Sequence, residues 1–394
     1  MKSIHGKRIL IGVSGGIAIY KTLSLISLLT KAGADCRVLM TEGARKFISP
    51  LSFQTMSGHR VYTELFDQEE GFIPHIDLTR EADVFLIAPA TADLLAKLAH
   101  GLGDDLLSST FLASVCPVIL SPSMNVHMFE NPSTQANLKT LKSRGVTLID
   151  PKEGHLACKE SGLGRMPEPE ELLDFLDTFF TEKDLKGKKI IITGGPTKER
   201  FDPVRYITND SSGKQGVALA RRAVKRGAQV IFIHGDLKVP EPQGSVNLHV
   251  EKTKEMLDAV DAHFEDCDAL IMAAAPCDMT PSHFSDNKMK KAGRTDEFTL
   301  SFRETVDILK TMGQKKTHQV LVGFAAETRN VEEYAKTKLT AKNADYIVAN
   351  NVALQGAGFD GDTNVVTIYG REDQKAYPML SKSDVADRIL DLLL

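Results

Sequence analysis

The sequence predicts an α/β chain with two doubly wound parallel-sheet domains in succession. Short apolar runs rich in β-branched residues alternate with helix-like segments, which is typical of parallel sheets covered by helices. Several of these runs end in Gly, Ser or Thr just before a helix pattern begins. The chain has 394 residues, a length that suits two or three domains better than one.

The first half contains five predicted strands, each a short apolar run. They are Arg8–Val13, Cys36–Met40, Val84–Ala88, Val118–Leu120 and Val146–Ile149. Helical spacing of apolar residues lies between them, clearest at Ala18–Lys31 and Ala92–Ala99, and a further helix pattern follows at Glu170–Phe180. We therefore expect strands and helices to alternate through this half.

The second half repeats the alternation. Its predicted strands are Lys189–Thr193, Gln229–Ile233, Ala269–Ala273, Val320–Phe324, Tyr346–Val348 and Val365–Tyr369. Its predicted helices are Lys214–Arg226, Lys254–Phe264, Glu332–Lys342 and Ser383–Leu393. A charged stretch with a glycine, Lys183–Lys188, separates the halves, so the prediction is two Rossmann-like domains, 1–186 and 187–394.

Composition excludes several classes of protein. Charged residues make up 25% and hydrophobic residues 42% of the chain, as in globular proteins. The net charge of −4 provides no general attraction to nucleic acid or to an anionic membrane. The N-terminus lacks a signal-peptide pattern, and the five cysteines are scattered without a CxxC pair. We expect a cytoplasmic protein with no nucleic-acid or membrane partner.

The most informative motif lies in the middle of the chain, at Ile192–Gly216. A strand ends in GGPT, and about fifteen residues later the sequence NDSSG precedes a helix pattern. Such turns leave backbone N–H groups free at a helix N-terminus, which favours binding of an anion. Arg200, Asp202 and Arg205 lie between the two turns. An ordinary strand–loop–helix connection is the alternative, but it does not account for this density of Gly, Ser, Thr and charge.

Four strands of the first half also end in small or polar residues. The sequences are GVSGG at Gly12–Gly16, TEGA from Thr41, APATAD from Ala88 and SPSMN at Ser121–Asn125. Ligands of open α/β sheets bind beyond the carboxyl ends of the strands, so these segments predict a single site. The GxSGG turn taken alone is equally typical of a tight strand–helix connection.

The motifs resemble two enzyme families that are commonly fused in bacteria. GPT, DPVR and NDSSG in that order resemble phosphopantothenate–cysteine ligases, and the first-half segments resemble flavoprotein cysteine decarboxylases. The resemblance spans nearly the whole chain. It implies a bifunctional enzyme of coenzyme A biosynthesis, with a flavoprotein-type decarboxylase domain at 1–186 and a ligase-type domain at 187–394. The substrates would be 4′-phosphopantothenate, L-cysteine and CTP.

In the first half, the resemblance implies an FMN site and three catalytic residues. The implied FMN-binding residues are Gly12, Ser14, Gly15, Gly16, Thr41, Thr91, Ser108 and Met124. His75 matches the active-site histidine of the family, Asn125 the asparagine that holds the substrate carboxylate, and Cys158 the cysteine of the substrate-clamping flap. Two departures are Ser121 and Ser123, where the family has APAMN, and Lys159, where it has glycine. They affect the expected rate and substrate fit and remove no catalytic group.

The implied decarboxylation is redox-neutral. FMN would oxidise the substrate thiol to a thioaldehyde, the carboxylate would leave as carbon dioxide, and Cys158 would protonate the enethiolate before hydride returns from the reduced flavin.

In the second half, the resemblance implies that CTP activates the carboxylate as an acyl-cytidylate, which cysteine then attacks. Asn209 would donate to the acyl carbonyl as the catalytic residue. The implied residues for CTP and phosphopantothenate are Ser211, Ser212, Gly213, Ala274, Ala275, Asp278, Lys288, Thr305, Val306, Asp307, Phe324, Lys338 and Lys342. Mg²⁺ would accompany CTP, with protein ligands that the sequence does not identify.

Two other interpretations are open to test. A nicotinamide-dependent oxidoreductase would need GxGxxG in the turn after the first strand of a unit, followed by an acidic residue at the second strand end. Neither GVSGG nor GGPT has that spacing. A non-catalytic flavin-binding regulator would be expected to lack His75, Asn125 or Cys158, and all three are present. The resemblance also implies a homo-oligomer, because the decarboxylases form trimers and the ligases form dimers.

Overall fold

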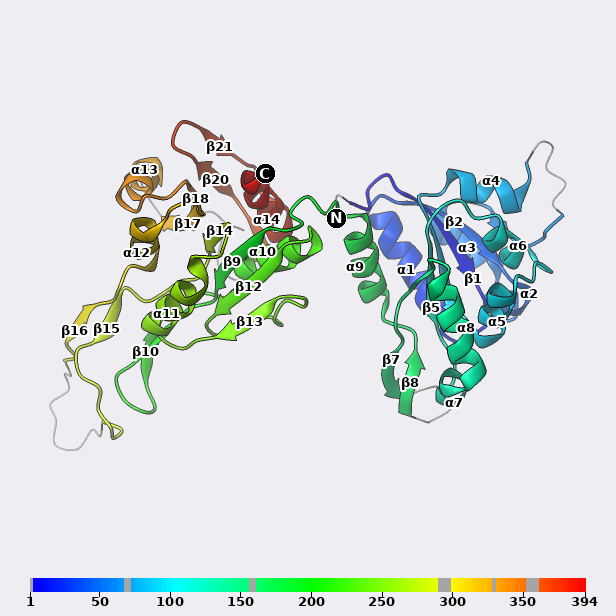
Figure 1. Ribbon diagram of the computed structural model, residues 1–394, viewed down its shortest axis with the longest axis horizontal. Helices are drawn as coiled ribbons and strands as arrows, with labels where there is room; N and C mark the ends of the chain where they lie inside the picture. The colour runs from blue at the N-terminus through cyan, green and yellow to red at the C-terminus, as the bar shows by residue number, and fades with distance from the viewer. Residues whose placement is uncertain (1–2, 67–71, 156–160, 290–298, 328–330, 352–360) are drawn as a thin grey trace. The chain divides into compact units, whose positions relative to one another are not determined.

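The computed structural model describes residues 3–66, 72–155, 161–289, 299–327, 331–351 and 361–394. They divide into two compact units, Met1–Thr181 and Glu182–Leu394, which we call unit 1 and unit 2 (Figure 1). Each unit has its own sheet and its own hydrophobic core.

The sheet of unit 1 has six parallel strands in the order β3-β2-β1-β4-β5-β6. Their bounds are β1 Arg8–Val13, β2 Asp35–Met40, β3 Val61–Tyr62, β4 Val84–Ala90, β5 Val118–Pro122 and β6 Thr147–Leu148. The order reverses between β1 and β4, so the chain first winds toward one edge and then toward the other. The doubly wound prediction is confirmed, and each of the five predicted strands is present.

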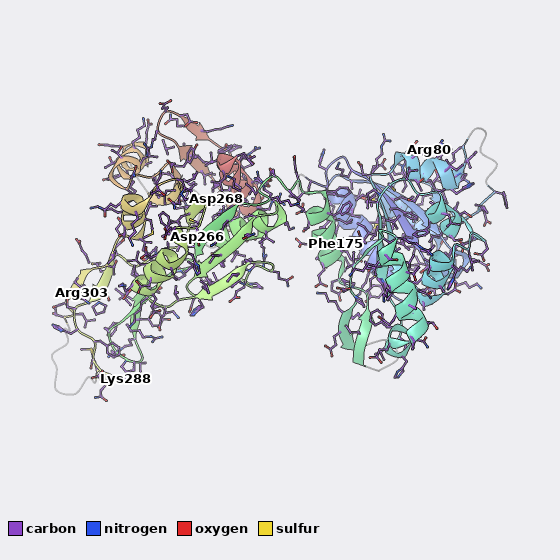
Figure 2. All side chains as sticks on the ribbon, viewed as in Figure 1. Arg80, Phe175, Asp266, Asp268, Lys288 and Arg303 are labelled. Atoms are coloured by element: carbon purple, nitrogen blue, oxygen red, sulfur yellow. The ribbon has the colours of Figure 1, made fainter. Side chains whose placement is uncertain are left out.

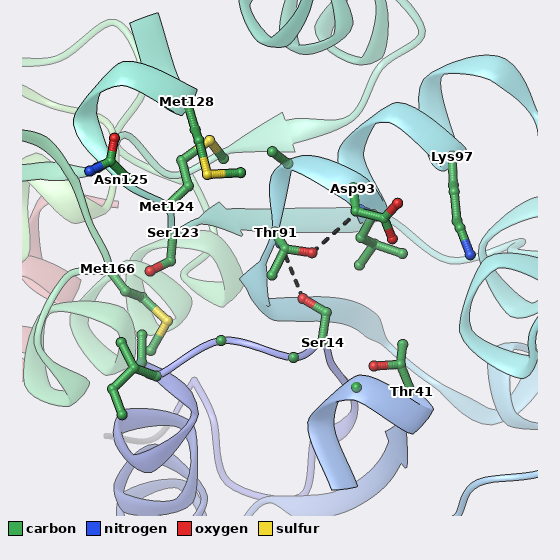
Figure 3. A pocket seen from close by; sticks show the side chains of 18 of the residues that line it. Ser14, Thr41, Thr91, Asp93, Lys97, Ser123, Met124, Asn125, Met128 and Met166 are labelled. Atoms are coloured by element: carbon green, nitrogen blue, oxygen red, sulfur yellow. Dashed lines mark hydrogen bonds between the residues drawn. The ribbon is translucent and has the colours of Figure 1, made fainter. Parts of the chain in front are cut away.

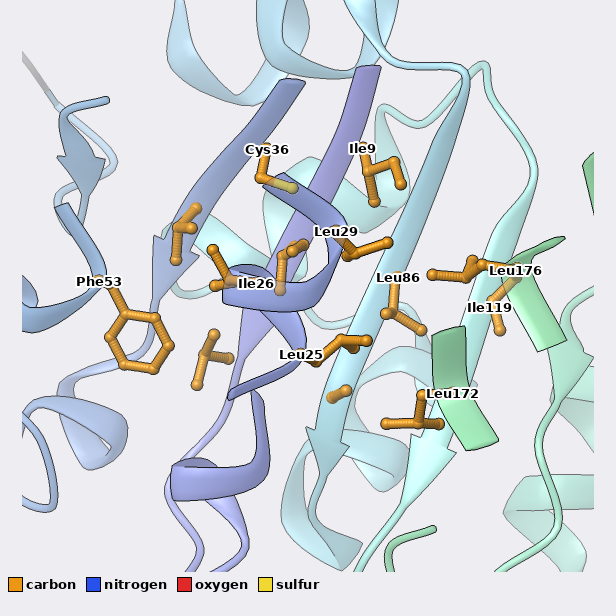
Figure 4. Packing of buried hydrophobic residues seen from close by; sticks show 14 of the residues in the cluster. Ile9, Leu25, Ile26, Leu29, Cys36, Phe53, Leu86, Ile119, Leu172 and Leu176 are labelled. Atoms are coloured by element: carbon orange, nitrogen blue, oxygen red, sulfur yellow. The ribbon is translucent and has the colours of Figure 1, made fainter. Parts of the chain in front are cut away.

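Helices cover both faces of this sheet. Packed on one face are α1 Ile19–Lys31, α3 Pro50–Ser57 and α9 Pro169–Phe180, and Figure 4 shows Leu25 and Leu172 of this cluster against the strands. On the other face lie α4 Pro74–Glu81, α5 Ala92–His100, α6 Leu106–Leu112 and α8 Pro132–Ser143. The strands contribute alternate residues to the two clusters, for example Ile9 to one and Leu10 to the other.

Three short elements of unit 1 lie at the carboxyl edge of the sheet or beside it. They are α2 Glu42–Arg45, α7 Val126–Glu130 and the antiparallel hairpin of β7 Lys152–His155 and β8 Ser161–Arg165. The sequence patterns did not predict this hairpin. Its glycine-rich strands lack the apolar alternation that marks a half-buried strand.

The sheet of unit 2 has the order β13-β12-β9-β14-β17-β18-β20-β21. The bounds are β9 Lys189–Gly194, β12 Gln229–His234, β13 Val246–His249, β14 Ala269–Met272, β17 Val320–Glu327, β18 Tyr346–Asn351, β20 Val366–Tyr369 and β21 Gln374–Ala376. The first six are parallel and repeat the reversal of unit 1, now between β9 and β14. The last two are antiparallel, so the parallel prediction was wrong for this edge.

Helices cover both faces of this second sheet as well. They are α10 Lys214–Lys225 and α14 Lys382–Leu390 on one face, and α11 Thr253–Phe264, α12 Ile308–Lys315 and α13 Val331–Ala341 on the other. The chain ends in the short 3-10 helix η1, Asp391–Leu393.

Three two-stranded pairs lie outside the main sheet of unit 2. They are β10 Lys198–Arg200 with β11 Tyr206–Thr208, β15 Met279–Pro281 with β16 Phe302–Glu304, and β19 Thr363–Asn364 with β22 Leu380–Ser381. No helix in the described part of the chain is long and apolar enough to cross a membrane.

Candidate active sites

In unit 1, Ser14 joins the carboxyl ends of β1 and β4. Its hydroxyl donates to the carbonyl of Pro89 (2.7 Å) and accepts from the N–H of Thr91 (3.1 Å). The backbone N–H of Ser14 also donates to the carbonyl of Pro89 (3.3 Å). The GVSGG turn and the APATAD loop therefore meet where the strand order reverses, which is the usual ligand position in this architecture.

Three helices begin at this point. Thr41 accepts from the N–H of Ala44 and caps α2, and Thr91 accepts from the N–H of Leu94 and caps α5. The third, α1, follows Gly16. A side chain on Gly15 would place its Cβ 2.7 Å from the backbone carbon of Gly43, so only glycine permits this approach. Converging helix N-termini suit a phosphate group.

A cavity of about 1040 Å³ opens at the same edge of the sheet. Its lining includes these predicted residues: Ser14, Gly15, Gly16, Thr41, Thr91, Met124 and Asn125. Met128 and Met166 line it as well, and Figure 3 shows the methionines on the side away from Thr41. One end of the cavity is thus suited to an anion, and the other offers polarisable apolar side chains that pack on flat rings.

Asn125 lies at the methionine end. Its side-chain oxygen accepts from the N–H of His127 (2.8 Å) and caps α7. Asn125 also lines the cavity, where the amide N–H groups are the hydrogen-bond donors of this side chain. An amide donor suits a carboxylate without placing a second charge in the cavity.

The structure separates other predicted residues from the cavity lining. Gly12 lies inside β1, under the side chains of Phe85 and Leu107. Ser108 is buried and forms a capping box with Asp105 at the start of α6. His75 lies in the first turn of α4, and its buried Nδ1 has no hydrogen-bond partner among the described residues.

Cys158 and Lys159 lie outside the described residues. Each of the four described cysteines has a raised pKa. Burial is the main cause, and it raises the pKa of the Cys36 and Cys267 thiols to about 12 and raises the pKa of Cys116 and Cys277 as well. These four side chains are therefore thiols at neutral pH and are poor nucleophiles.

Two lysines of the cavity lining were missed by the sequence analysis. Lys21 is 2% exposed, and Lys97 pairs with Asp104 (2.9 Å), whose hydrogen bond raises the pKa of the lysine. A signal for Lys21 existed. It follows Ala18 by three residues and precedes Leu25 by four, so helical spacing places it on the buried face of α1. Lys97 carries no comparable signal, because Asp104 lies in the next loop.

The site in unit 2 is built at the corresponding reversal, between β9 and β14. The N–H of Ala274 donates to the hydroxyl of Thr193 (3.1 Å), and the N–H of Ala275 donates to the carbonyl of Gly195 (2.9 Å). The side-chain nitrogen of Asn209 donates to the carbonyls of Ala275 (3.1 Å) and Pro276 (2.9 Å). Two predicted segments, NDSSG and AAAPCD, are therefore in direct contact.

A second set of bonds brings the segment Thr305–Asp307 to the same turn. The hydroxyl of Thr305 donates to the carbonyl of Cys277 (2.6 Å), and its N–H donates to the carbonyl of Asp278 (2.9 Å). Asp307 caps α12 and pairs with Lys342 (3.0 Å). The exposed Val306 lies between them. Asp278, the segment Thr305–Asp307 and Lys342 thus form one connected group.

Residues 211–213 lead into α10. Gly213 is its N-cap with φ +74°, a conformation that favours glycine. Ser212 is buried, and its carbonyl accepts from the N–H of Lys238, whereas Ser211 is half-buried. The turn has the geometry expected for an anion site at a helix N-terminus.

Lys288 is held indirectly by a buried carboxylate. Asp202 is 0% exposed and accepts from both Nε (3.0 Å) and Nη2 (2.7 Å) of Arg205 and from the N–H of Met289 (3.2 Å). Arg205 also donates to the carbonyl of Met289 (2.9 Å). The exposed Lys288, labelled in Figure 2, is therefore anchored next to the DPVR turn.

Burial alone raises the pKa of the Asp202 carboxyl. The hydrogen bonds from Arg205 and from backbone N–H groups outweigh burial and hold this pKa well below its usual range. Asp202 is thus a carboxylate at neutral pH, and it gives the DPVR turn a structural role. Phe324 is half-buried in β17, and Lys338 lies on α13.

Comparison with known proteins gives a consistent assignment. Residues 1–181 match the Flavoprotein family, and residues 185–394 match the DNA/pantothenate metabolism flavoprotein C-terminal domain. The coenzyme A biosynthesis bifunctional protein CoaBC of Bacillus subtilis is 46% identical over 393 residues, which cover 98% of this chain and 96% of that protein. This chain belongs to the CoaBC family. The CoaBC protein of Escherichia coli is 42% identical over 99% of this chain and 97% of its own length.

Solved structures similar to each half are known. A C-terminal domain of a CoaBC protein covers 54% of this chain and 96% of its own, with 41% identity and a TM-score of 0.46. A PPC decarboxylase mutant complexed with pantothenoylaminoethenethiol covers 45% of this chain and 99% of its own, with 32% identity and a TM-score of 0.42. Membership of the CoaBC family confirms the prediction of a bifunctional decarboxylase and ligase of coenzyme A biosynthesis.

Proposed function

We propose that unit 1 decarboxylates 4′-phosphopantothenoylcysteine with FMN and that unit 2 makes this compound from 4′-phosphopantothenate, L-cysteine and CTP. The ligation releases CMP and pyrophosphate, and the decarboxylation releases carbon dioxide and leaves 4′-phosphopantetheine. The product of unit 2 is then the substrate of unit 1. CTP and free cysteine are cytoplasmic compounds, so we place the enzyme in the cytoplasm.

The cavity in unit 1 fits FMN in size and in the chemistry of its two ends. Gly15, Thr41 and Thr91 would hold the phosphate with hydroxyl and backbone N–H groups at three helix starts. Ser14, whose O–H and N–H both donate to Pro89, would line the phosphate site and hold the two turns together. Met124, Met128 and Met166 would pack against the flavin ring. When bound, FMN would accept two electrons from the substrate thiol and return them after carbon dioxide has left.

The protein residues would orient the substrate and move protons. Asn125 would donate its amide N–H to the substrate carboxylate, and Cys158 would supply a proton to the enethiolate carbon after decarboxylation. Gly12 and Ser108 would act beneath the cavity, by shaping β1 and the start of α6. In these roles Asn125 and Cys158 act on the substrate as neutral groups, so no charged side chain is needed at the methionine end of the cavity.

His75 supports a site shared between copies of the chain. It does not line the cavity of its own unit, although it matches the catalytic histidine of the related decarboxylases. We propose that His75 completes the cavity of a neighbouring copy in a trimer of unit 1, and that unit 2 dimerises. A buried Nδ1 with no partner among the described residues is consistent with a group that completes its bonds in the assembly.

In unit 2, the turn Ser211–Gly213 would bind the phosphate of phosphopantothenate at the start of α10. Ala274, Ala275, Asp278 and the segment Thr305–Asp307 would surround CTP. Phe324, Lys288, Lys338 and Lys342 would complete this group, with the lysines neutralising phosphates. Asn209 would donate to the acyl carbonyl during cytidylate formation and cysteine attack.

Mg²⁺ would accompany the triphosphate. Among the described residues, no group of three His, Cys, Asp or Glu side chains could hold a metal ion. We therefore propose that oxygen atoms of CTP and water supply most of its ligands, as is common for Mg²⁺.

The observation that carries the proposal is the cavity at the β1–β4 reversal, with helix starts at one end and Asn125 at the other. Its test is mass spectrometry of the purified protein with phosphopantothenate, cysteine, CTP and Mg²⁺. Phosphopantetheine with one equivalent of CMP is expected. Accumulation of phosphopantothenoylcysteine would contradict the proposal for unit 1, and absence of both products would contradict it for unit 2.

A further inference from the structure

Lys21 is a buried cation beside the proposed FMN site. Its side chain is 3% exposed and belongs to α1, and the residue lines the cavity. The ammonium group donates to the carbonyl of Met166 (2.7 Å) and to Oε1 of Glu168 (3.0 Å). Only the Lys21 side of this ion pair is buried, because the Glu168 side chain is 45% exposed. Such a pair contributes little net stability, which leaves the positioning of its partners as the role to test.

The partners of Lys21 lie at the base of the β7–β8 hairpin. Arg165, the last residue of β8, donates to the same oxygen of Glu168. Lys152, the first residue of β7, pairs with Glu171 (2.8 Å), and the other oxygen of Glu171 accepts from the N–H of Glu168 (2.9 Å). Both arms of the hairpin are thus tied to the first turn of α9, and Lys21 ties that turn to α1.

The same hairpin contacts the loop that carries Asn125. The N–H of Met124 donates to the carbonyl of Gly164 (3.0 Å). Gly164 has φ +143°, and a Cβ there would lie 2.3 Å from the carbonyl oxygen of Met124. The two backbones are therefore in direct contact, with no side chain between them to absorb a shift. A displacement of residues 164–166 would be passed to residues 124 and 125.

We propose that Lys21 is a positioning residue for decarboxylation, which holds Met166 and the base of the β7–β8 hairpin so that Asn125 stays in place at the cavity. This inference rests on the proposed function of Asn125. Lys21 acts through the protein backbone, because its ammonium group is engaged by the carbonyl of Met166 and the carboxylate of Glu168. Loss of the contact should change catalysis more than flavin binding.

The test compares Lys21→Met, Lys21→Arg and Glu168→Gln in the full-length protein. Lys31→Met is the matched control, because Lys31 is exposed in the last turn of the same helix. FMN content, the visible flavin spectrum, and kcat and KM with synthetic phosphopantothenoylcysteine are measured, with CMP release by unit 2 as an internal control. For Lys21→Met we expect full FMN content and a kcat/KM about 10- to 100-fold lower, a size typical of misplaced substrate.

Lys21→Arg should have much of the wild-type activity. Glu168→Gln leaves the bond from Lys21 to the Met166 carbonyl in place, so its kcat/KM should fall less than that of Lys21→Met. If Lys21 acts through Asn125, the double variant with Asn125→Ala should be no worse than Asn125→Ala alone. Additive losses, unchanged kinetics in Lys21→Met, or activity restored by excess FMN would each overturn the inference. If Lys21→Met fails to fold, Lys21→Arg and Glu168→Gln are each combined with Asn125→Ala, and the same comparison of double and single variants tests the inference. A wild-type protein without decarboxylase activity would instead refute the proposed function.

Discussion

The side-chain nitrogen of Asn209 donates to the carbonyl of Pro276 at 2.9 Å, which ties the NDSSG segment to the turn after β14. Asn209 therefore orders the proposed CTP site before any substrate binds. To donate to an acyl carbonyl, its amide would have to exchange this bond or the bond to Ala275. The residue combines a structural and a chemical role, and substitutions can separate the two.

We expect Asn209→Ala to lower ligation about 10²- to 10³-fold, the usual loss when one preorganised donor is removed. Asn209→Asp should be at least as impaired, because a carboxylate would face two carbonyl oxygens. CMP release reports ligation, and decarboxylation of added phosphopantothenoylcysteine should be unchanged. Asn247→Ala is the control, since Asn247 bonds the carbonyl of Pro242 elsewhere in unit 2. Normal CMP release by Asn209→Ala would rule out the catalytic role.

Ser14→Ala should weaken FMN retention in unit 1. The change leaves the N–H of Thr91 without its side-chain acceptor and removes one donor from the carbonyl of Pro89, at a cost of about 1–3 kcal/mol. The measurement is the flavin content after gel filtration together with the midpoint of thermal unfolding. Ser24→Ala, an exposed serine of α1, should change neither. Unaltered FMN content in Ser14→Ala would contradict the proposed phosphate site.

Asn125→Asp separates capping from catalysis. Aspartate caps helices as well as asparagine does, so α7 should persist, but the new charge would repel the substrate carboxylate. We expect FMN to remain bound, decarboxylation to fall at least 100-fold, and phosphopantothenoylcysteine to accumulate in the coupled reaction. Mass spectrometry of the products checks this. A variant that still forms phosphopantetheine at the wild-type rate would show that Asn125 does not hold the carboxylate.

Acid should destabilise unit 2 through Asp202. The pKa of this carboxyl is lower in the folded protein than its unfolded value of about 3.9, so its contribution to stability is complete above that pH and is lost as pH falls below it. Calorimetry between pH 7 and pH 3 should show a smaller acid-induced drop in Tm for Asp202→Asn, which starts from a lower Tm. Asp210→Asn, at an exposed site, should follow the wild type. Equal acid sensitivity of the Asp202 and Asp210 variants would contradict this.

Features that depend on the pattern of neighbouring residues could be predicted from the sequence. Apolar runs placed the strands, and small residues at their ends identified the segments that surround the cavity, because parallel strands bring their carboxyl ends to one edge. Ser14 and Thr91 could be assigned to one site on this basis, although the bond between them could not. The edge strands β3 and β13 were missed, because β3 has two residues and β13 has only two apolar residues, Val246 and Leu248, separated by Asn247.

Contacts between distant segments escaped prediction. The ion pair between Lys152 and Glu171, and the bond from Met289 to Asp202, join residues with no shared motif. Lys21 is a further example. Helical spacing places this lysine on the buried face of α1, but its role could be inferred only after the structure showed its bond to the carbonyl of Met166. Such contacts depend on how loops fold back on the sheet. The residue pattern of a single sequence does not show which distant residues these loops bring together.

The contacts at the start of unit 2 determine where the chain can be divided into two stable halves. Leu185 is fully buried and donates its N–H to the carbonyl of Arg226, whose guanidinium also pairs with Asp184 and Asp391. A ligase half expressed from residue 187 would lack two of these partners, whereas one begun at Glu182 would keep them. Any gene fission that yields two working proteins should therefore cut upstream of Asp184, and a free ligase would carry this short N-terminal extension as part of its core.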